Sequence, residues 1–150
     1  TTNWKMMDYA ISFCDLGNKD YCKYIEFRTK YNLGDYICIS ILQGKTRGSG
    51  KNFEIFANGD FKVNYWRKAC QEAEQIIKIE EFYKGFKRRS FVFAMLHLLN
   101  HDNFDMNQML RKLELQKSKM IDCTNTEQYV ELLQKIYNHG QSKKVNLLDN

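Results

Sequence analysis

A short loop about a third of the way along the chain carries residue types that bind phosphate groups. The stretch 41–53 reads ILQGKTRGSGKNF and combines glycines, lysines and a threonine. A nucleotide-binding P-loop has the order G-x-x-x-x-G-K-[ST], in which backbone N–H groups surround the phosphates and the hydroxyl reaches magnesium. Neither Gly-Lys pair has a glycine five positions before it, and the strand-like residues FEIFANGDFKV follow where a helix is required. We therefore interpret the stretch as a basic loop whose cations can contact a phosphate backbone: Lys45, Arg47 and Lys51.

A second basic stretch, KGFKRRS over residues 84–90, joins two predicted helices. It contains no acid, and its four cations are Lys84, Lys87, Arg88 and Arg89. Ser90 is a candidate cap for the helix that follows, and the N-terminus of a helix attracts anions. The stretch can therefore hold a phosphate, although an ordinary solvated connection explains the same residues.

The remaining chemistry-bearing residues form weaker patterns. His97 and His101 have the spacing of two metal ligands on a helix, but no Glu or Cys stands beside them. We interpret them as structural histidines of an apolar helix. The five cysteines include no C-x-x-C pair, so we expect reduced thiols and no zinc site. No catalytic motif is recognised, and we expect no enzymatic activity, metal or cofactor.

The composition limits the class of protein. A chain of 150 residues with 43% hydrophobic residues suits one domain with a sizeable core. A formal net charge of +5 permits contact with nucleic acid. The longest apolar run, FVFAMLHLL, is too short to span a bilayer. We expect a single domain over 1–150, a cytoplasmic location and no membrane partner.

Apolar residues at helical spacing, together with capping residues, predict a mainly α-helical chain. The predicted helices are 3–16, 19–31, 35–43, 65–85, 91–100, 106–116 and 124–140. The β-branched isoleucines of 35–43 also allow a strand there. The expected caps are Asn3, Asn18, Asn64, Ser90, Asp105 and the Thr124–Glu127 capping box, and Gly140 is the expected stop. The last residues, 141–150, are predicted to form a loose tail.

Within residues 1–44, a turn at Asn32 between two helices suggests a helix-turn-helix. The apolar positions of that motif are filled by Phe27, Tyr31, Leu33, Cys38 and Ile41. The second helix presents no Arg or Lys at its outward positions, and its candidate base-reading residues are Tyr36, Ser40 and Gln43. An ordinary corner between two packed helices explains the same pattern, so both interpretations stay open.

Residues 45–64 are predicted to form the basic loop and a β-hairpin. Asn58-Gly59 between two short aromatic runs is a strong hairpin signal, and it would pair Phe56 with Phe61. Helix, turn, helix, basic loop and hairpin is the order of a winged helix. The predicted fold is therefore mainly α, a helical domain with a helix-turn-helix-like pair and one small β-hairpin in winged-helix-like order. A helical part over 65–140 completes it.

Four stretches resemble the helical region downstream of the ParB-like (ParB/sulfiredoxin) domain in certain phage and plasmid proteins. They read GNKDYCKYIEFRTKYNL, FANGDFKV, KRRSFVFAMLHLL and FDMNQMLRKL, and Trp4 and Tyr9 match the W-x(4)-Y-like start of that region. The resemblance covers most of the chain. It implies association with DNA in partition, plasmid or phage regulation. The ParB-like domain itself would precede Thr1, so its activity is not implied for these residues.

The leading hypothesis is therefore a non-enzymatic DNA-binding module of a phage or plasmid ParB-like protein. In it, the basic loops contact the phosphate backbone and the helix-turn-helix lies near the groove. The alternative is a protein-interaction module or inhibitor of a bacterial factor, whose candidate contact residues are Tyr21, Tyr24, Trp66 and Tyr83. A third hypothesis is a metal-dependent nuclease whose acids assemble only in three dimensions. DNA is the expected partner, and a homodimer stays open.

Overall fold

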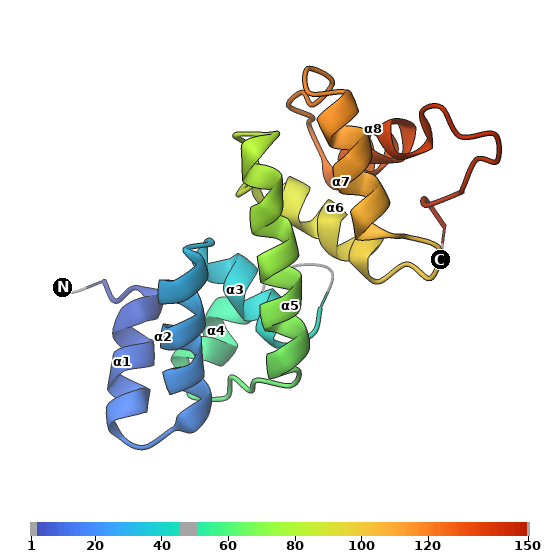
Figure 1. The fold of residues 1–150 in the computed structure, drawn as a ribbon. Coiled ribbons are helices and arrows are strands. Elements are labelled where there is room, and N and C mark those ends of the chain that lie inside the picture. The colour runs from blue at the N-terminus through green and yellow to red at the C-terminus, as the bar shows by residue number, and fades with distance from the viewer. Residues whose placement is uncertain (1–2, 46–50, 150) are drawn as a thin grey trace. The chain divides into compact units, whose positions relative to one another are not determined.

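The computed structural model describes residues 3–45 and 51–149, and in these residues it is helical and contains no strand. The chain forms two compact units, Thr1–Ala73 and Glu74–Asn150, here called the N-terminal and C-terminal units (Figure 1). The boundary falls inside helix α5 (Trp66–Ile77), which contributes residues to both. The prediction of one domain over 1–150 stays a prediction.

The N-terminal unit contains α1 (Met6–Asp15), α2 (Lys19–Tyr31), α3 (Asp35–Leu42), α4 (Asn52–Ala57) and the first part of α5. The predicted bounds of α2 are confirmed, and its start is set by Asn18, whose side chain accepts a hydrogen bond from Asp20 N at 3.1 Å. Lys5, rather than Asn3, precedes the first turn of α1, and its backbone N–H donates to Asp8. α5 begins at Trp66, so Asn64 lies one residue before the position that the cap would occupy, and its side-chain amide donates to the carbonyl of Gln43.

The predicted β-hairpin is wrong, and the reason lies in how Asn58-Gly59 is used. Residues 52–57 form α4, and Gly59, at φ +83°, ends that helix. Gly59 N donates to the Phe56 carbonyl and Asp60 N to the Ile55 carbonyl, which is the Schellman arrangement of a helix C-terminus. Asn58 has φ −85°, whereas the tight hairpin turn requires positive φ at both central residues. The winged-helix-like order is lost with the hairpin.

The core of the N-terminal unit is built from aromatic rings. Tyr21, Tyr24, Phe27, Phe56 and Phe61 are all buried. The ring centroids of Phe56 and Phe61 are 5.2 Å apart, so the expected contact between them forms without a hairpin. The extended residues after α4 bond to α2 instead of to a strand: Phe61 N donates to the Tyr21 hydroxyl at 3.3 Å.

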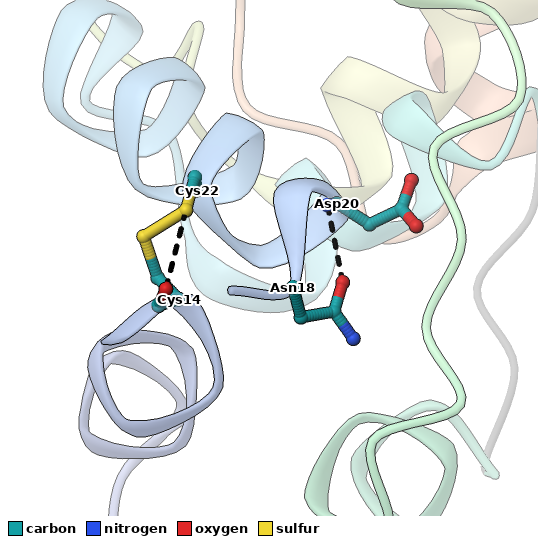
Figure 2. Close-up of a disulfide and its surroundings, with 4 residues drawn as sticks. All are labelled: Cys14, Asn18, Asp20 and Cys22. Carbon is teal, nitrogen blue, oxygen red and sulfur yellow. Dashed lines mark hydrogen bonds between the residues drawn. A yellow bond between two sulfur atoms is a disulfide. The ribbon is translucent and has the colours of Figure 1, made fainter. Parts of the chain in front are cut away.

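A disulfide joins the end of α1 to the start of α2. Cys14 and Cys22 are bonded, with their Cα atoms 4.9 Å apart, and Figure 2 shows the bridge beside the capping residue Asn18. Gly17, at φ +94°, reverses the chain between the two helices. The prediction of reduced thiols is therefore wrong for this pair. The other three cysteines are free: Cys38, Cys70 and Cys123.

The C-terminal unit contains the end of α5, the 3₁₀ helix η1 (Lys78–Glu81), α6 (Arg89–Leu99), α7 (Met106–Leu115) and α8 (Thr126–Asn138). The predicted cap Asp105 is confirmed, since its carboxylate accepts from Asn107 N at 2.9 Å. The cap of α8 is Asn125, which accepts from Gln128 N, and not the predicted Thr124. Gly140 follows α8 at φ +76°, as expected for a stop.

The predicted loose tail is wrong for residues 141–149. Leu147 is fully buried, and its carbonyl accepts a hydrogen bond from His97 Nε2 at 2.8 Å. His101 Nε2 donates to the Asp149 carbonyl, and Asn138 bonds both the N–H and the carbonyl of Val145. The two histidines therefore hold the C-terminal segment through backbone carbonyls. In the described residues, no group of three or more metal-binding side chains is found.

Candidate nucleic-acid interface

The corner between α2 and α3 has the turn that a helix-turn-helix requires but not an exposed second helix. Asn32 adopts a left-handed conformation at φ 52°. Arg28 bonds Asp35 at 2.9 Å, and the Tyr24 hydroxyl donates to the same carboxylate at 2.7 Å. Every residue of α3 from position 37 to 42 is buried. These six consecutive residues cover every side of α3 after its first turn, and Tyr36 in that first turn is exposed. Beyond its first turn, α3 therefore has no exposed face that could lie along a DNA groove.

The three candidate base-reading residues therefore differ in how far they are exposed to solvent. Ser40 is fully buried, and its hydroxyl accepts from the Asn52 side-chain amide at 3.3 Å. Gln43 is half-buried, and its Oε1 has no hydrogen-bond partner in the described part of the chain. Tyr36 is 37% exposed. Reading of bases by Ser40 is thus excluded in this fold.

The basic loop is described only at its ends. Lys45 and Lys51 are exposed. Arg47 lies outside the described residues, which stop at Lys45 and resume at Lys51. The proposed phosphate contact of this loop stays a prediction.

The second basic stretch lies directly before α6. Lys84, Lys87, Arg88 and Arg89 are all exposed. α6 begins at Arg89, so Ser90 falls within the first turn and does not cap the helix. The N-cap residue Arg88 makes no side-chain capping hydrogen bond, and the first turn contains no acid. Uncapped N–H groups and the positive end of the helix dipole favour an anion at this place.

A network of side chains positions the guanidinium of Arg88. Its Nη1 lies 2.9 Å from Asp122 Oδ1 and donates to the Tyr129 hydroxyl at 3.3 Å. The Tyr83 hydroxyl donates to Asp122 Oδ1 at 2.6 Å and lies 2.5 Å from the Tyr129 hydroxyl. Gly85 is required beside it, because a Cβ there would lie 2.5 Å from the Tyr83 ring.

This network changes the proton affinity of its members. The hydrogen bond from Tyr83, followed by the nearby Arg88 charge, lowers the pKa of Asp122 below its ordinary 3.8 despite some desolvation. Burial, and then the hydrogen bond to Asp122, raises the pKa of Tyr83. At neutral pH the carboxylate is charged and the phenol is neutral. Asp122 therefore offsets one of the four positive charges of residues 84–89.

The sequence did not reveal Tyr83, Asp122 and Tyr129 as a group. Asp122 and Tyr129 lie 39 and 46 positions after Tyr83, and no local pattern links residues at such separations. Comparison of the chain with protein-family models, with curated proteins and with solved structures found no match. None of the helices in the described ranges is long and apolar enough to cross a bilayer.

Proposed function

We propose that this chain is a non-catalytic DNA-binding module that contacts the phosphate backbone with residues 84–89. It would serve in a phage or plasmid protein of the ParB-like kind that its sequence resembles. The observation that carries the proposal is the gathering of four exposed cations at the uncapped start of α6. Phosphate oxygens are anionic acceptors, and lysine, arginine and helix N-termini are the groups that bind them.

The proposed binding is independent of DNA sequence. Contacts to phosphate position a protein on the duplex but do not distinguish bases. Burial of residues 37–42 leaves α3 without an exposed face along which it could read the groove. Arg88, held by Asp122 and Tyr129, supplies an oriented donor, while Lys84 and Lys87 supply exposed charge. Lys45, Arg47 and Lys51 remain proposed as further phosphate contacts of the N-terminal unit.

The test is fluorescence anisotropy of a labelled duplex, titrated with protein over a range of salt concentrations. For K84E/K87E we expect weaker binding on every sequence, and a slope of log affinity against log salt reduced by about 1.8 for two lost phosphate contacts. The matched control is K119E/K143E, which changes the same charge at two exposed lysines of the same unit. Equal losses in both variants, or no binding of the original chain at low salt, would exclude the proposal.

A protein-interaction module is the second candidate, although its predicted contact residues do not support it. Tyr21, Tyr24 and Tyr83 are buried and Trp66 is half-buried. A different observation favours this function: α1 and its flanks expose Trp4, Ile11 and Leu16, with Leu16 80% exposed. If the I11S/L16S variant no longer binds a protein partner but still binds the duplex as the original chain does, this function is supported. If the variant binds the protein partner unchanged, α1 is not the contact surface.

A further inference from the structure

Helix α7 carries a shallow, open groove that the DNA-binding proposal does not use. The groove has a volume of about 460 Å³ and is lined by Phe82, Leu110, Arg111, Glu114 and Leu115. All five residues belong to the C-terminal unit. Leu115 is 76% exposed, and single exposed leucines are common on protein surfaces. Here, however, Leu115 shares its groove with Phe82 and Leu110, so the apolar side chains form a connected surface, which we call the α7 face.

The charges of the α7 face carry the argument about what covers it. Arg111 and Glu114 are three positions apart on one helix, so they are neighbours on its surface. The face therefore presents one cation and one anion beside an apolar centre. A strongly acidic or strongly basic partner would meet a like charge. In a twofold-symmetric pair of copies, Arg111 of each copy can lie opposite Glu114 of the other, which gives two reciprocal ion pairs.

The existing contact of Glu114 does not prevent this pairing. Glu114 Oε1 lies 2.9 Å from Lys117 Nζ, and the two side chains are 56% and 68% exposed. Exposed pairs of this kind contribute little to stability. A carboxylate has two oxygens and accepts several hydrogen bonds, so Glu114 has capacity for a second cation.

We propose that the α7 face is the interface of a twofold-symmetric homodimer of this chain. Leu110, Leu115 and Phe82 form its apolar centre, and Arg111 and Glu114 form two reciprocal ion pairs at its rim. This inference does not rest on DNA binding. A face of this size with so few apolar residues makes a dimer that dissociates on dilution rather than a permanent one.

Sedimentation analysis over a range of protein concentrations tests the proposal through charge exchange. R111E alone and E114R alone each place like charges opposite one another twice, so each dissociation constant should rise about tenfold or more. An equimolar mixture of the two variants restores opposite charges at both pairs and should associate again. The double variant R111E/E114R should also regain the association of the original chain.

The control is K119E, an exposed charge change outside the α7 face, which should leave the association unchanged. L115D should weaken association without any change of rim pairing, because it places a charge in the apolar centre. A chain that stays monomeric at every accessible concentration would overturn the proposal. So would single charge variants that associate as the original chain does, or a mixture that fails to re-form dimers.

Discussion

The two units each contain a buried tyrosine hydroxyl at the centre of a hydrogen-bond network, and the networks differ in their partners. In the N-terminal unit, Tyr21 donates to the Phe56 carbonyl at 2.7 Å and accepts from Phe61 N at 3.3 Å. In the C-terminal unit, Tyr83 bonds Asp122 and Tyr129, which are side chains. One network therefore binds backbone that cannot titrate, and the other includes a carboxylate that can.

The difference separates two tasks for the same kind of residue. Tyr21 fixes the path of the chain after α4, because the two backbone groups it bonds flank the Gly59 reversal. Tyr83 instead fixes charges: its carboxylate partner Asp122 also holds Arg88, next to the proposed phosphate contacts. We expect disruption of the first network to cost mainly stability. Disruption of the second should change mainly the electrostatics of residues 84–89.

The largest effect is expected from emptying the aromatic core around Tyr21. Phe56 is fully buried, and its ring lies 4.7 Å from the centroids of both Tyr21 and Tyr24. F56A should lower the free energy of unfolding by about 3–5 kcal/mol, because it removes buried apolar area and leaves a cavity. Urea unfolding followed by circular dichroism measures it. The control F53A removes a ring that is 39% exposed, and equal losses in both variants would contradict this account of the core.

The next effect concerns the disulfide of the N-terminal unit. C14S/C22S should lower the stability by about 2.5 kcal/mol, the loop-closure contribution of a bridge over so short a segment. The original chain should lose the same amount of stability when dithiothreitol reduces the disulfide. A free-thiol assay on the unfolded, unreduced chain should find three thiols. Five thiols would show that the bridge does not form, as is usual in a reducing cytoplasm.

Much of the helical framework could be predicted because its signals are local. Asn18 and Asp105 mark helix starts through their own side chains, and each acts within two residues. The prediction of a hairpin was wrong because Asn58-Gly59 is equally suited to a hairpin turn and to a helix end. The choice between them depends on Tyr21, which bonds residues 35 and 40 positions away. Hydrophobic periodicity contains no information about such contacts.

The candidate site could be predicted only in part, because some of its residues form a local pattern and others come from distant segments. A run of cations is visible in the sequence, so Lys84, Lys87, Arg88 and Arg89 could be named. The partner of Arg88 could not, because Asp122 comes from a different segment and has no distinguishing neighbour. The burial of Ser40 was missed because α3 is apolar on nearly every side, while the helix-turn-helix pattern assumes one exposed face.

A third prediction compares the two tyrosines directly. Y21F removes the hydroxyl and leaves the Phe56 carbonyl and Phe61 N–H without this partner in the core, so we expect a loss of about 1–3 kcal/mol. Y83F should cost less, because water can replace the bond to the 72% exposed side chain of Asp122, and the Tyr129 hydroxyl keeps its bond from Arg88. Unfolding of both variants in urea makes the comparison. A larger loss for Y83F would reverse our assignment of roles to the two networks.

The smallest effect, and the most specific to the C-terminal unit, is expected in acid. The pKa of folded Asp122 is lowered from 3.8, so its interactions stabilise the fold above that pH. The contribution is lost as pH falls from 3.8 through the lower folded value, because the unfolded chain then binds the proton first. The melting temperature of D122N should therefore fall less between pH 5 and pH 2 than the melting temperature of the original chain does. A titration in alkali would not distinguish the two units, because burial raises the pKa of both Tyr21 and Tyr83, so that each unit loses stability above pH 10.

D122N also removes the negative charge beside Arg88, so duplex binding at neutral pH should strengthen modestly if residues 84–89 contact phosphate. If the melting temperature of D122N depends less on pH but its duplex binding is unchanged, the role of Asp122 in the Tyr83 network is supported and Arg88 does not contact DNA.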